Sequence, residues 1–101
     1  MKTKVFENGT IKECLARCLE EGFVPCNLKR AYEYSKKHHV WVDCRAVFVK
    51  GIIRNATMKE LRDIESFYKN RGSLLFVDND GSGLLGDDLL DLSGRFVGVK
   101  K

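Results

Sequence analysis

The chain has 101 residues, of which 44% are apolar, and its formal net charge is +4. This length allows one compact domain, and the apolar fraction excludes a disordered or collagen-like protein. The longest uninterrupted apolar runs contain three or four residues, far fewer than the ~20 that cross a bilayer. We therefore expect a single globular domain over residues 1–101 and no membrane partner.

The chain begins with a basic tetrapeptide (MKTK), but no apolar stretch follows it, so we expect no export signal. The four cysteines are then expected to stay reduced, because the cytoplasm does not favour disulfides. The lack of glutamine and the 32% of charged residues are typical of a thermophilic source. We therefore expect a small cytoplasmic domain from a prokaryote.

The first predicted elements are a short strand over residues 4–6 and a helix after it. Thr10 and Glu13 match a capping box, in which each side chain accepts a hydrogen bond from the backbone amide of the other residue. Gly22 is placed to end this helix. Helical spacing predicts one buried face, made of Ile11, Cys14, Leu15, Cys18 and Leu19.

A second helix is expected from Asn27 to about Lys37, since asparagine is a favoured N-cap residue. Its other side is mostly basic. Its apolar side is expected to contain Leu28, Ala31, Tyr32 and Ser35.

The run from Val40 to Val49 is β-branched and aromatic and predicts the longest strand. Lys50 and Gly51 predict the turn of a hairpin, so the two strands of this hairpin are 40–49 and 52–56. Alternation places the even-numbered residues from 40 to 48 on the core side. Trp41, Asp43 and Arg45 are expected on the opposite face, together with Val47 and Val49.

A second capping box, Thr57 and Glu60, begins a helix that is expected to end at Gly72. Its predicted buried residues are Met58, Leu61, Ile64 and either Phe67 or Tyr68. Further strands are expected over 73–78 and 95–100, separated by a loop rich in glycine and aspartate. Because helices and strands do not alternate strictly, we predict an α+β fold with three helices packed on a small mixed or antiparallel sheet.

The two capping boxes lie in closely matching hexapeptides, NGTIKE at 8–13 and NATMKE at 55–60. The flanking sequences do not continue the match. Two helix starts built from the same chemistry explain the likeness better than an internal duplication.

The cysteines at 14, 18, 26 and 44 include two that are one helical turn apart, which is a spacing that zinc ligation allows. Both lie within the predicted buried face of a helix, where cysteine acts as a small apolar residue. We therefore expect core cysteines and no zinc site. Cys26, between a proline and a helix start, is the only candidate for a reactive thiol.

The segment LLFVDNDGS at 74–82 resembles the nucleophile motif of haloacid-dehalogenase-type phosphatases, an apolar strand followed by D-x-D-G-T. Only 21 residues follow Asp80, which leaves no room for the later motifs of that family. The same residues resemble half of an EF-hand loop, with Asp78, Asp80 and Ser82 in ligand positions, but Leu89 stands where calcium needs a glutamate. A solvated loop is the better interpretation, and these three residues remain weak metal candidates.

Charge is divided along the chain, because residues 29–50 contain six basic residues and residues 72–92 contain five aspartates and no base. An aromatic residue surrounded by bases is typical of a surface for single-stranded nucleic acid, although no standard nucleic-acid-binding motif is present. Alternatively, a helix covers Trp41, and Asp43 pairs with Arg45 internally. The candidate binding residues are Trp41, Arg45, Arg54, Lys36, Lys37 and Lys50.

These patterns favour a non-enzymatic binding module whose basic face meets an anionic partner, either nucleic acid or an acidic protein. The first alternative is a self-associating interaction module. In it, the aspartate-rich region 78–91 docks against the basic region 29–50 of a second copy, or an edge strand near the C-terminus pairs between the copies. The second is a divalent-metal-dependent activity at Asp78 and Asp80. We assign no catalytic residue and expect no cofactor.

Overall fold

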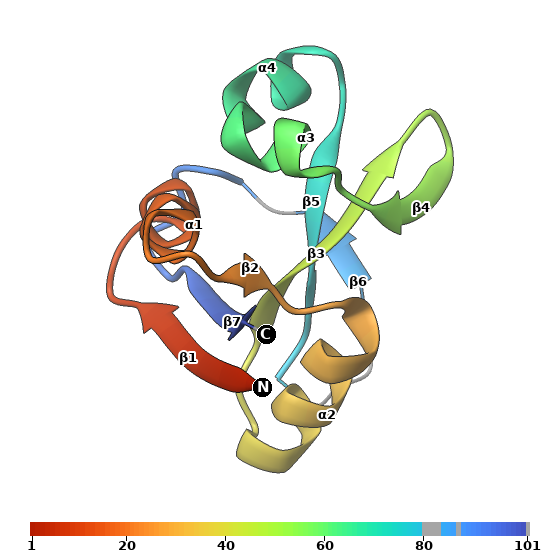
Figure 1. The fold of residues 1–101 in the computed structure, drawn as a ribbon. Coiled ribbons are helices and arrows are strands. Elements are labelled where there is room, and N and C mark those ends of the chain that lie inside the picture. Colours follow the sequence, from red (N-terminus) through yellow and green to blue (C-terminus); the bar gives the residue numbers. More distant parts are fainter. Residues whose placement is uncertain (80–83, 87, 101) are drawn as a thin grey trace.

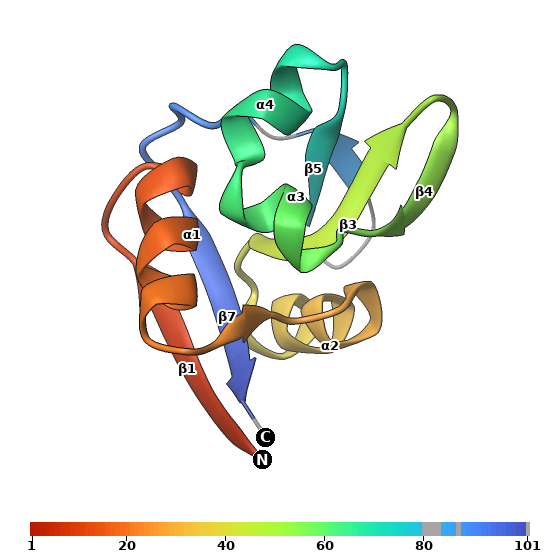
Figure 2. The same ribbon diagram turned by 45° about the horizontal axis from the view of Figure 1, so that its top comes forward.

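A mixed β-sheet forms the middle of the fold, and helices cover both of its faces (Figures 1 and 2). The computed structural model describes residues 1–79, 84–86 and 88–100. The elements in chain order are β1 (Lys2–Glu7), α1 (Ile11–Glu20), β2 (Val24–Pro25), α2 (Leu28–His38), β3 (Val42–Val49), β4 (Ile52–Asn55), α3 (Met58–Arg62), α4 (Ile64–Lys69), β5 (Ser73–Val77), β6 (Leu84–Gly86) and β7 (Arg95–Lys100).

The strand order is β1-β7-β3-β5-β6, with β2 paired to β7 and β4 paired to β3. The β3–β7 pair is parallel and the other pairs are antiparallel, which confirms the predicted α+β class with a mixed sheet. The last strand, β7, lies between β1 and β3. It is therefore not the edge strand that the sequence led us to expect. No helix in the described residues is long and apolar enough to cross a membrane.

The two faces of the sheet carry separate core clusters. Leu74 and Phe96 belong to one cluster, and their chain neighbours Leu75 and Val97 belong to the other, since adjacent strand residues point to opposite faces. The first cluster includes buried residues of α1, α3 and α4, whereas α2 supplies Ala31 to the second. The sheet is therefore covered on both sides, and the prediction of one core face and one exposed face for β3 is wrong.

Both predicted capping boxes are present. The amide of Glu13 donates to the Thr10 hydroxyl over 3.0 Å, and the amide of Thr10 donates to the Glu13 carboxylate over 2.9 Å. Thr57 and Glu60 repeat this arrangement at the start of α3. Asn27 caps α2 by accepting from the amide of Arg30. The local start signals of these three helices were therefore predicted correctly.

Gly22 ends α1 as predicted. It has a positive φ of 81°, its amide donates to the carbonyl of Leu19, and the amide of Phe23 donates to the carbonyl of Cys18. These two bonds form a Schellman motif, in which glycine is favoured at the left-handed position.

The predicted single helix up to Gly72 is two helices, α3 and α4, separated by Asp63 with φ −123° and ψ 57°. Leu61 and Ile64 on either side of the break are both buried, so the apolar spacing continues and does not reveal it. The left-handed residue after α4 is Arg71, with φ 65°. Gly72 is required for a different reason, because a Cβ there would lie 2.3 Å from the Phe67 ring.

The hairpin turn is formed by Lys50 and Gly51, whose φ values are 51° and 76°. Two positive φ values are typical of a type I′ turn, and the turn lies where the sequence predicted it. The hairpin strands are Val42–Val49 and Ile52–Asn55, shorter than the predicted 40–49 and 52–56. α2 ends at His38 with His39 as a left-handed cap, and Val40 and Trp41 lie between α2 and the start of β3.

Candidate functional site

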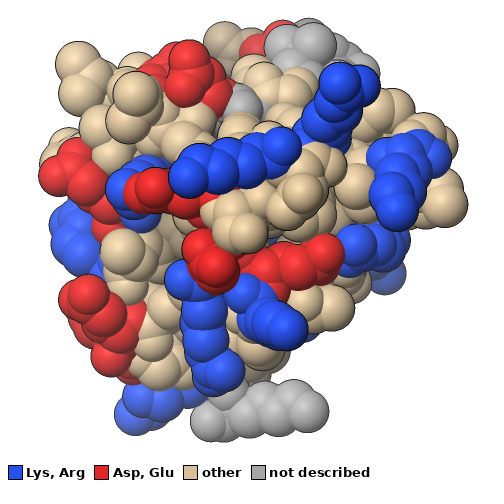
Figure 3. Space-filling view, turned by 90° about the horizontal axis from the view of Figure 1, so that it is seen from above, with Lys and Arg blue, Asp and Glu red and all other residues tan. Residues whose placement is uncertain are grey.

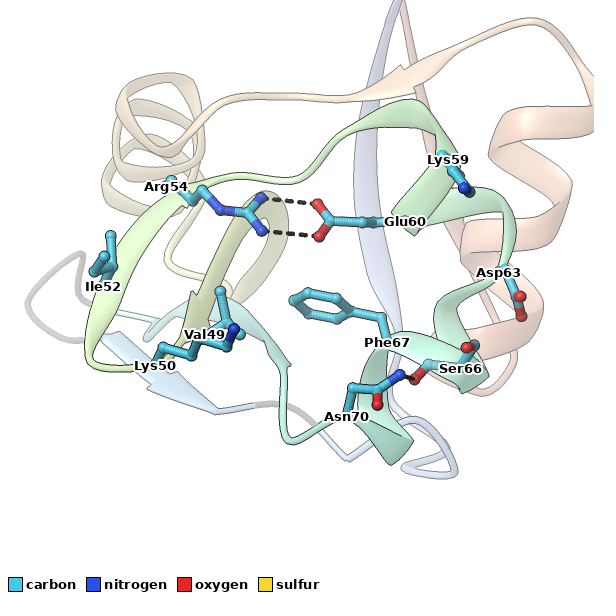
Figure 4. A pocket seen from close by; sticks show the side chains of 10 residues that line it. All are labelled: Val49, Lys50, Ile52, Arg54, Lys59, Glu60, Asp63, Ser66, Phe67 and Asn70. Atoms are coloured by element: carbon cyan, nitrogen blue, oxygen red, sulfur yellow. Dashed lines mark hydrogen bonds and ion pairs between the residues drawn. The ribbon is translucent and has the colours of Figure 1, made fainter.

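A groove lies between the β3–β4 hairpin and the helices α3 and α4 (Figure 4). We call it the hairpin groove, and its volume is about 430 Å³. The hairpin projects beyond the edge of the main sheet (Figure 1), so its inner side is left open toward the two helices. The groove is lined by Val49, Lys50, Ile52, Arg54, Lys59, Glu60, Asp63, Ser66, Phe67 and Asn70.

Apolar side chains from both walls form the interior of the groove. Val49 and Ile52 are paired across the hairpin, and the Phe67 ring lies between them and the helical wall (Figure 4). Phe67 is buried, but Ile52 is 59% exposed. The exposed isoleucine beside the buried aromatic ring is apolar surface that an apolar group of a ligand can cover.

One side of the groove is closed by an ion pair between Arg54 and Glu60 (Figure 4). Both guanidinium NH groups donate to the Glu60 carboxylate over 2.8 Å. These bonds, together with the hydrogen bond from the Thr57 amide, lower the pKa of Glu60 to about 2, and the same pair raises the pKa of Arg54. Arg54 therefore ties the hairpin to α3.

Lys50 and Lys59 are the other two cations of the hairpin groove. Both are exposed, and neither forms an ion pair within the described part of the chain. Asp63 lies at the helical end of the groove (Figure 4). Because Glu60 already neutralises Arg54, the two lysines are left to interact with an anionic ligand.

Charges of both signs are interspersed on the face seen from above in Figure 3. Among the described residues seen on this face, neither sign of charge forms a continuous patch. Ion pairs such as the one between Lys12 and Glu65 bring the two signs of charge together. The predicted division between residues 29–50 and 72–92 stays a prediction.

Trp41 and Arg45 are half-buried. The Trp41 ring packs edge-on against Phe76, with ring centroids 4.8 Å apart, and also packs against the first core cluster. Arg45 donates through Nε to the carbonyl of Ala56 over 2.7 Å. Asp43 is buried, and its carboxylate accepts from the Arg95 amide. The expectation that these three residues form an exposed face is wrong, because α1, α3 and α4 cover that face.

The structure does not gather the six candidate binding residues into one surface. Arg54 lies opposite Val47, six residues along the chain from Trp41, which corresponds to roughly 20 Å of extended chain. Lys36 and Lys37 are in the last turn of α2, on the other face of the sheet. Only Lys50 and Arg54 line the hairpin groove.

Sequence reasoning missed Lys59 and Phe67 as parts of a site. Lys59 was passed over because it lies inside a capping box, and Phe67 because its helical spacing marked it as a core residue. The short distance along the chain between the hairpin and the second capping box could have indicated that α3 lies beside the hairpin.

Arg45 instead lines a second cavity of about 400 Å³ on the other side of β4. Arg54 borders the first cavity and its neighbour Asn55 borders the second. The residues around the second cavity are Met1, Gly22, Val24, Pro25, Asn27, Arg45, Asn55, Val99 and Lys100.

All four cysteines are buried and none forms a disulfide. Burial raises the pKa of Cys18 and of Cys26 to about 12. Cys26 is therefore not the partly exposed, reactive thiol that its place in the sequence suggested. A thiol that stays protonated in this way is a poor nucleophile.

The weak metal candidates cannot be compared as a set, because Asp80 and Ser82 lie outside the described residues. Asp78 is half-buried, its carbonyl accepts from the Ser35 hydroxyl, and its carboxylate accepts from the amide of Asn79. Within the ranges described above, no group of three histidine, cysteine or acidic residues is arranged to hold a metal ion.

The hairpin groove combines a partly exposed apolar interior with two unpaired cations. Among the described residues that line it there is one hydroxyl, on Ser66, and no histidine or thiol. A partly apolar groove with a few charged side chains on its walls is typical of a ligand-binding site. No family model, curated protein or solved structure matches the chain.

Proposed function

We propose that this protein is a non-enzymatic binding module that holds an anionic partner in the hairpin groove. The observation that carries the proposal is the position of Lys50 and Lys59 on opposite walls of the groove, beside exposed apolar surface. A ligand with both negative and apolar groups is complementary to this arrangement.

The ion pair between Arg54 and Glu60 supports this choice of site. It fixes the spacing between β4 and α3 before a ligand arrives, so less conformational entropy is lost on binding. The remaining cations are exposed lysines, which attract an anion over a distance that depends on the salt concentration.

The test is a salt titration of binding with three anionic probes: a single-stranded oligonucleotide, a double-stranded oligonucleotide and a short peptide of glutamate and valine. We expect the peptide to bind at low salt and to dissociate as the salt concentration rises. Absence of binding to all three probes at low salt would rule the proposal out.

Reversing the charge of the two groove lysines tests whether the anionic probe binds in the hairpin groove. The double variant Lys50→Glu/Lys59→Glu should weaken binding by about tenfold or more, because it replaces attraction by repulsion at both walls. Lys36→Glu/Lys37→Glu makes the same charge change on α2 and is the matched control. Equal losses in the two variants would show that net charge matters and the groove does not.

A further inference from the structure

The outer edge of β4 is open. Among the described residues β4 pairs with β3 alone, and all four of its residues are exposed. An open edge of this kind offers unpaired backbone amides and carbonyls to another strand.

One backbone hydrogen bond fixes which backbone groups of β4 point outward. The amide of Ala56 donates to the carbonyl of Arg45 over 2.9 Å, so Ala56 faces β3, and by alternation Ile52 and Arg54 do as well. Ile53 and Asn55 therefore direct their backbone groups away from β3. In agreement, the Asn55 carbonyl accepts from the Arg54 side chain over 3.1 Å.

Apolar side chains flank this edge on both faces of the hairpin. Phe48 and Ile53 are paired and are 45% and 51% exposed. Ile52 lies on the other face, in the hairpin groove. A strand added beside β4 would cover apolar surface on both faces with its alternate side chains.

The charges near β4 indicate whether a second copy of this chain or a different protein pairs with its open edge. A second copy of the hairpin would bring another Lys50 to an edge where Lys50 already has no ion-pair partner among the described residues, and like charges on adjacent strands repel. Acidic side chains are complementary to Lys50 and to Lys59 across the groove.

We propose that β4 is a docking edge for an extended peptide segment of a partner protein, rich in acidic and apolar residues, that adds to the sheet as a further strand. Ile53 and Asn55 supply the backbone hydrogen bonds, Phe48 and Ile53 contact the apolar side chains, and Lys50 and Lys59 attract the acidic ones. This inference rests on the proposed function, because it names the partner class of the same groove.

The first test selects ligands from a randomised library of short linear peptides at low salt. We expect the enriched sequences to mix acidic with β-branched or aromatic residues. Failure to enrich any sequence, or enrichment of basic sequences, would overturn the inference.

The second test follows amide hydrogen exchange in the wild-type protein, without and with a selected peptide. In the free protein the Ile53 amide should exchange much faster than those of Ile52 and Arg54. The peptide should slow exchange at Ile53 and Asn55 by about tenfold or more. Slowing at these amides by oligonucleotide, or by raising the concentration of the protein alone, would identify a different occupant and contradict the inference.

Variants separate this inference from the proposed function. Ile53→Pro removes the outward amide but no bond of the β3–β4 ladder, and it should weaken peptide binding by about tenfold. Ile53→Ala keeps the amide and should have a smaller effect. If Ile53→Pro fails to fold, the exchange measurement decides alone. Binding that depends on Lys50 and Lys59 but leaves Ile53 unprotected would refute strand addition and retain the groove.

Discussion

Two segments of this protein begin a helix with the same capping box, but one helix packs on the core and the other borders a groove. Residues 8–13 and 55–60 both place an N-cap threonine three residues before a glutamate, and both form a complete capping box. The first box begins α1, which has ten residues and a buried face; the second begins α3, which has five residues and borders the hairpin groove.

Small residues beneath α1 account for its close packing. A Cβ on Gly94 would lie 2.9 Å from the Cα of Ile11 and 3.0 Å from the sulfur of Cys14. A Cβ on Gly98 would lie 2.9 Å from Phe6 and from Phe23. Gly94, just before β7, and Gly98 within it therefore let α1 approach the sheet closely.

The second segment uses the same side chains for different contacts. Lys12 in the first box pairs with Glu65, whereas its counterpart Lys59 is unpaired among the described residues and lines the groove. Glu60 accepts both the capping bond and the Arg54 guanidinium. The comparison teaches that a capping box fixes where a helix starts, and that the residues facing the helix decide whether it closes a core or borders a site.

The largest expected effect is at the closely packed region. Gly98→Ala should lower the free energy of unfolding by about 2–3 kcal/mol, because the new methyl group overlaps two aromatic side chains. The control is Gly51→Ala at the hairpin turn, where no atom lies within 4 Å of the added Cβ. Strain at its positive φ should cost about 1 kcal/mol. Denaturant unfolding of both variants measures these changes. Equal losses of unfolding free energy would contradict the claim that the region around Gly98 is the more closely packed one.

The two capping glutamates should respond differently to loss of charge. Glutamine preserves the box, so Glu60→Gln removes mainly the charged pair with Arg54 and should cost about 1 kcal/mol near neutral pH. Glu13→Gln should cost less, because Glu13 forms no ion pair within the described part of the chain.

The pH dependence provides a second check on Glu60. Its pKa falls from 4.5 to about 2 on folding, so its contribution is complete above pH 4.5 and is lost as the pH falls toward 2. The stability gap between wild type and Glu60→Gln should therefore narrow over this range. A gap that stays constant would mean that the ion pair does not stabilise the folded state.

The smallest expected change in stability is at the residue that follows the C-terminal end of α4. The first region ends α1 with a left-handed glycine, but the second places Arg71 at the equivalent position after α4. Arg71→Gly should therefore raise the free energy of unfolding by about 0.5 kcal/mol, since glycine adopts positive φ without strain. A decrease in stability, measured by thermal unfolding, would show that the Arg71 side chain contributes more than its backbone costs.

The sequence predicted those features that depend on neighbouring residues. Both capping boxes, the left-handed Gly22 and the Lys50–Gly51 turn follow from local chemistry and are present. The break at Asp63 was missed because the buried spacing on either side continues through it.

The candidate site was less predictable, because it depends on contacts between distant elements. Trp41 is half-buried because other segments cover its face of the sheet, and alternation along one strand does not show what covers that face. Lys50 and Arg54 were chosen for their charge, but the ion pair with Glu60 and the opposing Lys59 follow from how α3 meets the hairpin.

The most direct measurement of the central claim is an amide chemical-shift map of the labelled protein during titration with the glutamate–valine peptide at low salt. We predict that the largest changes fall on residues 49–54 and 59–70, around the hairpin groove, with little change at Lys36 and Lys37. Changes centred on the end of α2, or spread evenly over all exposed lysines, would contradict the assignment of the groove as the binding site.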